Sequence, residues 1–245
     1  MVPVDEKVLR IRIEEELRSH VRQDYAAYFE DKADEDTVYH HLGVPTPALR
    51  RTAASFLRQV KAEGITDIDP VLQICDHLLS CKISELRTIA FQWSFNFRNH
   101  FRPEHFDVFE RWVMTYVTGW GSCDDLCTHS LGHFLHEYPE YIPKVKTWTF
   151  SPNAMVRRAS AVAFIYSLRR GKYVEHIFEV ADALLTDVED LVQKGYGWML
   201  KEATKAYETE VFDYVMARKA IMPRTALRYA IEKMSKDLRA KAMER

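Results

Sequence analysis

The segment 119–125, with the sequence GWGSCDD, combines an aromatic side chain with two adjacent carboxylates. Ser122, followed three residues later by Asp125, is typical of the start of a helix and places Asp124 in the first turn. On a helical wheel Asp125 lies toward the polar face, whereas Asp124 lies at the edge of an apolar stripe. A carboxylate in that position, at the positive end of a helix, is either an additional cap or a catalytic group held ionised.

A second tryptophan, Trp198, lies in the predicted helix 189–207 but points away from its apolar stripe. That stripe consists of Val192, Tyr196, Met199, Leu200 and Ala203. The face around Trp198 carries Lys194, Lys201, Lys205 and Glu202. Gly195 and Gly197 flank the indole, and because a glycine inside a helix costs about 1 kcal/mol relative to alanine, we expect their small size to have a use. Such a face suits either a nucleic-acid backbone or the packing of a neighbouring helix.

Two arginines, Arg158 and Arg169, lie eleven residues apart in the predicted helix 153–170. Their wheel positions differ by about 20°, so they share one line of a helix that is otherwise apolar almost all round. Such arginines are either phosphate clamps, because the guanidinium group matches phosphate oxygens, or ion-pair partners of the acidic helix that follows.

Two cysteines and three histidines lie within fourteen residues and raise the question of a metal site. The wheel puts Cys123 and Cys127 on one side and His129, His133 and His136 on the other. These side chains cannot converge on one ion without another segment, so we expect no metal. The sequence also lacks a Gly-rich phosphate loop, a nucleophile elbow and an HExxH motif, and we expect no cofactor.

The elements that position these residues are predicted to be helices, because apolar residues recur at spacings of three and four and no strand-like alternation extends over six residues. The predicted helices are 5–30, 47–62, 70–80, 84–98, 103–117, 123–137, 140–148, 153–170, 173–186, 189–207, 209–220 and 223–234. This pattern favours an all-α fold, an α-solenoid of stacked antiparallel HEAT-like helix pairs that forms a single curved domain over 1–245. An irregular helical bundle is the alternative.

Proline punctuates these helices. Six prolines stand just before an apolar-periodic stretch, where a missing backbone N–H costs nothing: Pro47, Pro70, Pro103, Pro139, Pro152 and Pro223. We expect Thr46, Asp69 and Ser151 to cap the helices that follow them.

The charge balance of the 245 residues, 34 Lys and Arg against 36 Asp and Glu, at first argues against nucleic-acid binding. The charges are segmented, however. Residues 144–172 contain seven basic residues and no acid, whereas 173–193 contain six acids and no Lys or Arg. We therefore expect a basic inner surface; the alternative is two oppositely charged faces that merely solvate the fold.

The first twenty residues lack the apolar core of a targeting signal, and the uncharged run 159–168 is far shorter than the roughly 20 residues that span a bilayer. The four cysteines include no CxxC pair, which favours reduced thiols. We expect a soluble, cytoplasmic monomer without membrane contact.

Five segments carry a resemblance to a known family. They are HLGVPTPALRR (41–51), GWGSCDDL (119–126), LGHFLHEYPEYIPKVKTW (131–148), SPNAMVRRASA (151–161) and VQKGYGWMLKEATK (192–205). The chain resembles the AlkD-like DNA alkylation repair family, alkylpurine DNA glycosylases built from HEAT-like repeats, over most of its length and most strongly over 119–230. The family's N-terminal cleft tyrosine has no clear counterpart: Asp34 aligns nearest, and Tyr39 is the candidate substitute.

The resemblance implies that Trp120, Asp124, Arg158 and Trp198 form the active cleft and that Lys201 contacts a phosphate. The implied reaction is hydrolysis of the N-glycosidic bond of cationic alkylated purines, N3-methyladenine and N7-methylguanine, in duplex DNA without base flipping. Asp124 would stabilise the charge that grows on the deoxyribose, with Trp120 and Trp198 against the sugar. The expected DNA contacts are Arg158, Arg169, Lys194, Lys201 and Lys205.

The alternative function is a HEAT-like scaffold that binds DNA or a protein without catalysis. The two hypotheses differ in the geometry that they require. Catalysis requires Trp120, Asp124, Arg158 and Trp198 to line one groove with a positive rim. Burial of Trp198, or an arginine partner for Asp124 inside the core, would argue against it.

Overall fold

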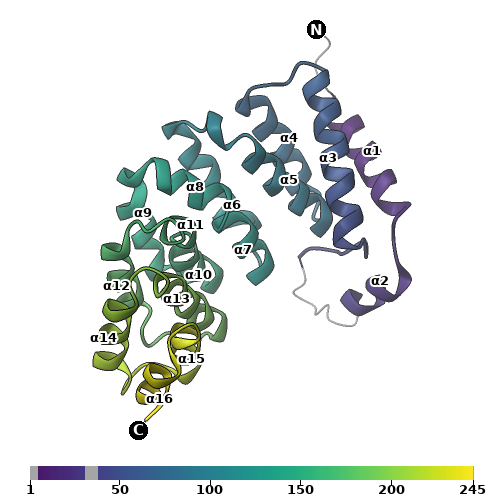
Figure 1. Ribbon diagram of the computed structural model, residues 1–245. Coiled ribbons are helices and arrows are strands. Elements are labelled where there is room, and N and C mark those ends of the chain that lie inside the picture. Colours follow the sequence, from purple (N-terminus) through teal and green to yellow (C-terminus); the bar gives the residue numbers. More distant parts are fainter. Residues whose placement is uncertain (1–4, 31–37, 245) are drawn as a thin grey trace. The chain divides into compact units, whose positions relative to one another are not determined.

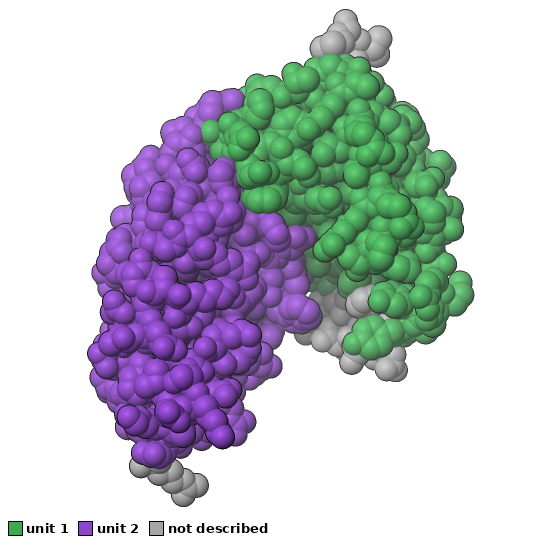
Figure 2. Space-filling view, in the orientation of Figure 1, with its two compact units in different colours: residues 1–101 green, residues 102–245 purple. Residues whose placement is uncertain are grey.

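The computed structural model describes residues 5–30 and 38–244, and every regular element in these ranges is a helix (Figure 1). A single isolated β-bridge pairs His40 with Ile83. The all-α prediction is confirmed. The chain divides into two compact units, residues 1–101 and 102–245 (Figure 2), and the single curved domain over 1–245 stays a prediction.

Unit 1 has its own apolar core. Its described helices are α1 (Glu6–Arg18), α2 (Gln23–Glu30), α3 (Thr46–Ala62), α4 (Ile68–Ser80), α5 (Ser84–Asn96) and the 3₁₀ turn Arg98–His100. α5 packs against α3 and α4, and α1 packs against the same two helices. Trp93 of α5 is fully buried, and its indole N–H donates to the carbonyl of Ala53 in α3 at 2.9 Å.

A buried carboxylate fixes the loop before α3. The side chain of Glu85 accepts hydrogen bonds from the backbone N–H groups of Leu42, Gly43 and Val44 at 3.0–3.3 Å. Gly43 has a φ of +86°, and a Cβ there would lie 2.6 Å from the backbone N of Ala26, so only glycine fits. The HLGV segment of the sequence is therefore a structural turn of unit 1.

Tyr39 also belongs to the core of unit 1. It is buried, its hydroxyl donates to the carbonyl of Leu79 at 3.0 Å, and the guanidinium of Arg87 lies 3.9 Å from the centre of its ring. This contradicts the expectation that Tyr39 substitutes for the family's cleft tyrosine. Asp34, the nearest aligned residue, lies outside the described residues.

Unit 2 is a succession of packed helices. Its 3₁₀ turns are Pro103–His105, Pro139–Tyr141 and Trp148–Phe150. Its α-helices are α6 (Phe106–Tyr116), α7 (Trp120–Cys127), α8 (Ser130–Glu137), α9 (Ile142–Thr147), α10 (Ala154–Val162), α11 (Ile165–Leu168), α12 (Val174–Ala183), α13 (Asp190–Ala203), α14 (Glu208–Arg218), α15 (Arg224–Ile231) and α16 (Lys236–Met243). We call α7, α10, α13 and α15 the inner helices, because each packs on the next in that order while α9, α12 and α14 lie along the opposite side (Figure 1). This arrangement is solenoid-like, as predicted.

Three predicted helices are interrupted: 5–30 at 19–22, 123–137 at 128–129 and 153–170 at 163–164. Gly132 lies just after the second break, where a Cβ would lie 2.5 Å from the carbonyl oxygen of Cys127, so this close approach requires glycine. The third break separates Arg158 in α10 from Arg169, which caps the C-terminus of α11. The two arginines therefore do not share one helix, contrary to prediction.

The helix caps and the last helix also differ from the prediction. The N-caps of α3, α4 and α10 are Pro45, Asp67 and Asn153, instead of Thr46, Asp69 and Ser151. Proline thus marks each start to within two residues without identifying the cap. The sequence pattern misses α16, because only Ala242 of its eight residues is buried.

The two glycines of α13 serve helix packing. A Cβ on Gly197 would lie 2.7 Å from Cβ of Tyr229 and 2.9 Å from the carbonyl oxygen of Ala226, both in α15. A Cβ on Gly195 would lie 2.9 Å from Cγ of Arg158 in α10. Both glycines are buried. They allow α13 to pack closely against α10 and α15. The expectation that their small size makes room for nucleic acid around Trp198 is therefore wrong.

We predict that Gly197→Ala destabilises the protein by about 1–3 kcal/mol, because the new methyl group overlaps the backbone of α15. This is opposite in sign to the usual gain of about 1 kcal/mol for alanine over glycine in a helix. Thermal unfolding followed by circular dichroism measures it. Gly121→Ala in α7 is the control, since a Cβ there has no neighbour within 4 Å. Melting shifts of the same sign in both variants would contradict this account.

Candidate active site

The inner helices of unit 2 enclose a cleft of about 390 Å³. Trp120 and Asp124 of α7, Arg158 of α10 and Trp198 of α13 all line it, as the sequence predicts. The remaining lining residues are Leu191, Lys194, Lys201 and Tyr229. Four stretches of chain, each at least 28 residues from the next, thus contribute to one site.

The first turns of α7 position Trp120 and Asp124 in the cleft. Gly119 is the N-cap, and the hydroxyl of Ser122 accepts a hydrogen bond from the backbone N–H of Gly119 at 3.2 Å. The helix therefore begins at Trp120, earlier than the predicted start at Ser122. Trp120 occupies the first turn with 62 % of its surface exposed, and Asp124 follows about one turn later.

Asp124 forms an ion pair with Arg158: its Oδ1 accepts a hydrogen bond from Nη2 at 2.7 Å. The carboxylate is the more exposed partner, with 24 % of its side chain accessible against 5 % for the arginine. Burial raises the pKa of Asp124, and the positive charge of Arg158 opposes that rise. An arginine partner inside the core is the arrangement expected to argue against catalysis, but here the negative member of the pair lines the cleft.

Arg158 is held from two further sides. Its Nη1 donates to the carbonyl of Leu191 at 2.6 Å, and its Cγ lies against Gly195. Its Nε is buried and has no hydrogen-bond partner among the described residues. Because its guanidinium group bonds to Asp124 of α7 and to the backbone of α13, Arg158 holds these two walls of the cleft together. The free phosphate clamp predicted from the sequence is not seen.

Trp198 is half-buried and is fixed by Glu202, one turn further along α13. The indole N–H donates to Oε1 of Glu202 at 3.1 Å, and the guanidinium of Arg169 lies 5.8 Å from the centre of the ring. Glu202 also accepts hydrogen bonds from Arg169 and Lys205. The expected DNA contacts Arg169 and Lys205 do not line the cleft; they are ion-paired to Glu202 instead.

Glu202 is a buried hub of negative charge. Burial alone would raise its pKa, but hydrogen bonds from Arg169, Lys205 and Trp198 outweigh that effect and lower the pKa to about 2. The carboxylate is therefore ionised throughout the physiological range. It fixes the orientation of Trp198, since a tryptophan whose N–H is bonded cannot turn without losing that bond.

The cations at the edge of the cleft are paired as well. Lys194 pairs with Asp190, and Lys201 pairs with Glu232 at 3.1 Å while lying 5.5 Å from the centre of the Tyr229 ring. The positive rim expected from the sequence is thus largely neutralised. The same holds in the basic stretch 144–172, where Lys144, Lys146 and Arg157 pair with Glu110, Glu179 and Asp187.

Leu191 and Tyr229 line the cleft, Glu232 pairs with Lys201 and Glu202 fixes Trp198, and none of these four roles was predicted from the sequence. Glu202 carries a usable signal, since it lies four residues after Trp198 and three before Lys205. The position of Tyr229 depends on how α15 packs against α13, and no local pattern reports it. Among the described residues, no group of three His, Cys, Asp or Glu side chains could hold a metal ion.

The cleft thus combines one accessible carboxylate, two indole rings, a buried arginine bonded to the backbone, and two lysines paired with carboxylates. A carboxylate and aromatic faces both attract positive charge. A model of the DNA alkylation repair enzyme family matches residues 13–234. The chain belongs to this family.

A solved structure described as a predicted DNA alkylation repair enzyme from Enterococcus faecalis has a similar fold. The TM-score is 0.75, and the match covers 89 % of this chain and 98 % of that chain at 16 % sequence identity. At that identity the likeness supports the fold alone. None of the curated proteins matches the chain. Within the described residues, no helix of this member of the DNA alkylation repair family has the length and apolar character to cross a membrane.

We predict that Glu202→Gln lowers stability at neutral pH and that the deficit shrinks in acid. Because folding lowers the pKa of Glu202 from 4.5 to about 2, its ionised form contributes about 3 kcal/mol above pH 4.5, which is lost as the pH falls toward 2. Urea unfolding at neutral pH and at intervals below pH 4.5 measures the difference between variant and wild type. The exposed Glu140→Gln is the control and should behave as wild type. A constant deficit across this pH range would contradict the assignment.

Proposed function

We propose that this member of the DNA alkylation repair family is a DNA glycosylase for cationic alkylated purines, with N3-methyladenine and N7-methylguanine in duplex DNA as its substrates. The observation that carries the proposal is an accessible carboxylate, Asp124, that lines one cleft together with two indole rings. This geometry favours a substrate that becomes positively charged at its sugar, since both kinds of group stabilise a cation.

The reaction needs little acid catalysis. The alkylated base already carries a positive charge, so it leaves with the electron pair of the N-glycosidic bond and becomes neutral. The charge moves to the deoxyribose, which passes through an oxocarbenium-like state. Water then adds to the anomeric carbon and loses a proton to solvent. The protein's task is to stabilise the sugar cation.

Asp124 is suited to that task. Oδ1 is held by Arg158, and Oδ2 has no hydrogen-bond partner among the described residues. Since Arg158 is the more buried partner, the pair turns its negative end toward the cleft. The free oxygen is then available for the sugar cation or for orienting the attacking water.

The two tryptophans would enclose the sugar. Trp120 is exposed at the first turn of α7, and Trp198 is fixed by Glu202 on α13. A ring that is already fixed loses no rotamer freedom when the substrate binds. Lys194 and Lys201 would contact phosphates by exchanging their present partners, Asp190 and Glu232, for the DNA backbone. An open cleft of this kind supports catalysis on the lesion without flipping the base out of the duplex.

The alternative, a scaffold that binds DNA without catalysis, draws support from the Asp124–Arg158 pair, which could be purely structural. The proposal and the alternative differ in one measurement. The proposed enzyme releases methylated purines, whereas the scaffold binds DNA and releases none.

We predict that Asp124→Asn lowers single-turnover release of N3-methyladenine or N7-methylguanine from methylated duplex DNA by about 10²-fold or more, because the neutral amide cannot stabilise the sugar cation. Chromatography of released bases measures it. Asp125→Asn, which changes the neighbouring residue outside the cleft, is the matched control and should retain activity. Equal release by wild type and Asp124→Asn would refute the mechanism, and no release by wild type would favour the scaffold.

The pH dependence of release gives a second test. Because burial raises the pKa of Asp124, the carboxylate becomes protonated at a higher pH than an ordinary aspartate. We therefore expect the single-turnover rate to fall, as the pH is lowered, above the usual range of aspartate titration. Release without enzyme, measured at each pH, must be subtracted. A rate that stays constant down to the ordinary aspartate range would contradict the role of Asp124.

A further inference from the structure

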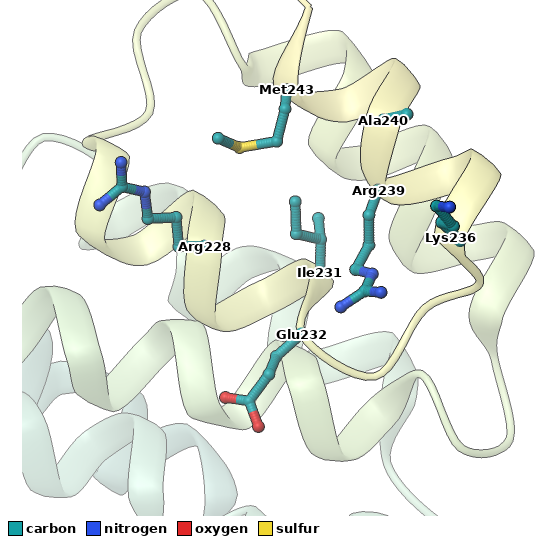
Figure 3. Close-up of a pocket in the computed structure, with 7 residues that line it drawn as sticks. All are labelled: Arg228, Ile231, Glu232, Lys236, Arg239, Ala240 and Met243. Atoms are coloured by element: carbon teal, nitrogen blue, oxygen red, sulfur yellow. The ribbon is translucent and has the colours of Figure 1, made fainter.

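A second groove of about 410 Å³ lies in unit 2 between α15 and α16. Ile231 and Met243 face the space between the two helices, with Arg228 on one side and Lys236 and Arg239 on the other (Figure 3). The groove therefore has an apolar floor and cationic sides.

The three cations differ from those of the cleft. Arg228, Lys236 and Arg239 are exposed, and their side chains make no hydrogen bond or ion pair with any described residue. In the cleft, by contrast, Arg158, Lys194 and Lys201 each have an acidic partner. The cations of the groove are thus free of acidic partners, whereas those of the cleft are not.

The groove adjoins the cleft through α15. Arg228 in the groove directly precedes Tyr229 in the cleft. Glu232 lines the groove, and its carboxylate accepts the hydrogen bond of Lys201 in the cleft at 3.1 Å. The only acid of the groove is therefore already engaged by a cleft residue, and its charge does not cancel the three free cations.

We propose that the α15–α16 groove binds the sugar–phosphate backbone of the same DNA whose lesion occupies the cleft; this inference rests on the proposed function. Phosphates would contact Arg228, Lys236 and Arg239, and the apolar faces of the deoxyriboses would lie on Ile231 and Met243. A nucleic-acid backbone alternates anionic and apolar groups in this way. The continuity of groove and cleft along α15 favours DNA over an acidic peptide or an anionic membrane.

The test is the binding of an unmodified duplex to the triple variant R228A/K236A/R239A of the full chain, followed by fluorescence anisotropy at several salt concentrations. Each phosphate contact contributes about 0.9 to the slope of log K against log salt, so three lost contacts reduce the slope by about 2.7. We expect Kd to rise at least about tenfold, uniformly across sequences. The single variant R239A should lower the slope by about one.

The matched control is K144A/K146A/K172A, which also removes three positive charges but at positions outside the inner helices. It should bind as wild type does. Because Lys146 of the control is half-buried and ion-paired with Glu179, thermal melting verifies that each variant is folded. A triple variant with wild-type Kd and slope, or a control that loses as much affinity, overturns the proposal.

Two further outcomes are distinct. If the triple variant binds DNA normally but loses binding to phosphatidylserine vesicles or to polyglutamate, the groove serves a membrane or an acidic peptide and the proposal is wrong. The readout uses unmodified DNA and does not depend on base release. A wild type that releases no base but binds DNA through the groove would therefore refute the proposed function alone.

Discussion

A guanidinium group that is almost fully buried must find acceptors, because leaving such a charge unpaired inside a protein costs several kcal/mol. Arg158 meets this constraint by bonding Asp124 of α7 and the carbonyl of Leu191 in α13, from its own position on α10. Gly195 supplies the room for its side chain. One buried arginine thus ties three inner helices together, and the same contacts position the carboxylate at the edge of the cleft.

Structure and function are therefore difficult to separate at Asp124. A carboxylate needed only for pairing could be as buried as its partner, but Asp124 keeps 24 % of its side chain accessible and one oxygen free of hydrogen bonds among the described residues. Glu202 provides the contrast. It is buried, pairs with Arg169 and Lys205, and does not line the cleft. The first carboxylate is accessible from the cleft, and the second fixes the orientation of Trp198.

Helical periodicity could predict which side chains of a single helix are buried and which point outward. The buried stripe of α13, Val192 to Ala203, and the outward position of Trp198 follow from the 3.6-residue repeat alone. Contacts between helices could not be predicted in this way. Gly197 serves the approach of α15, and the lysines around Trp198 have acidic partners that lie on other turns or other helices. The breaks at 128–129 and 163–164 were not predicted either, and Arg158 and Arg169 pair with different carboxylates despite their shared wheel position.

The near-neutral charge of the chain reflects, in large part, ion pairs between its basic and acidic side chains. Five of the seven cations of 144–172 are ion-paired, so they stabilise contacts between elements and contribute little net field: Lys144, Lys146, Arg157, Arg158 and Arg169. Three further cations without an acidic partner among the described residues, Arg228, Lys236 and Arg239, lie on α15 and α16, beyond the end of the acid-free stretch. A long-range electrostatic field comes from unpaired charges, whereas paired charges in a cleft mainly fix the positions of side chains. The residues that attract a polyanion therefore need not be the residues that react with it. A DNA backbone bound at α15–α16 would place a phosphate near Glu232, and the two negative charges would repel each other. This repulsion would weaken the Lys201–Glu232 ion pair and favour an ion pair between Lys201 and a phosphate of the DNA.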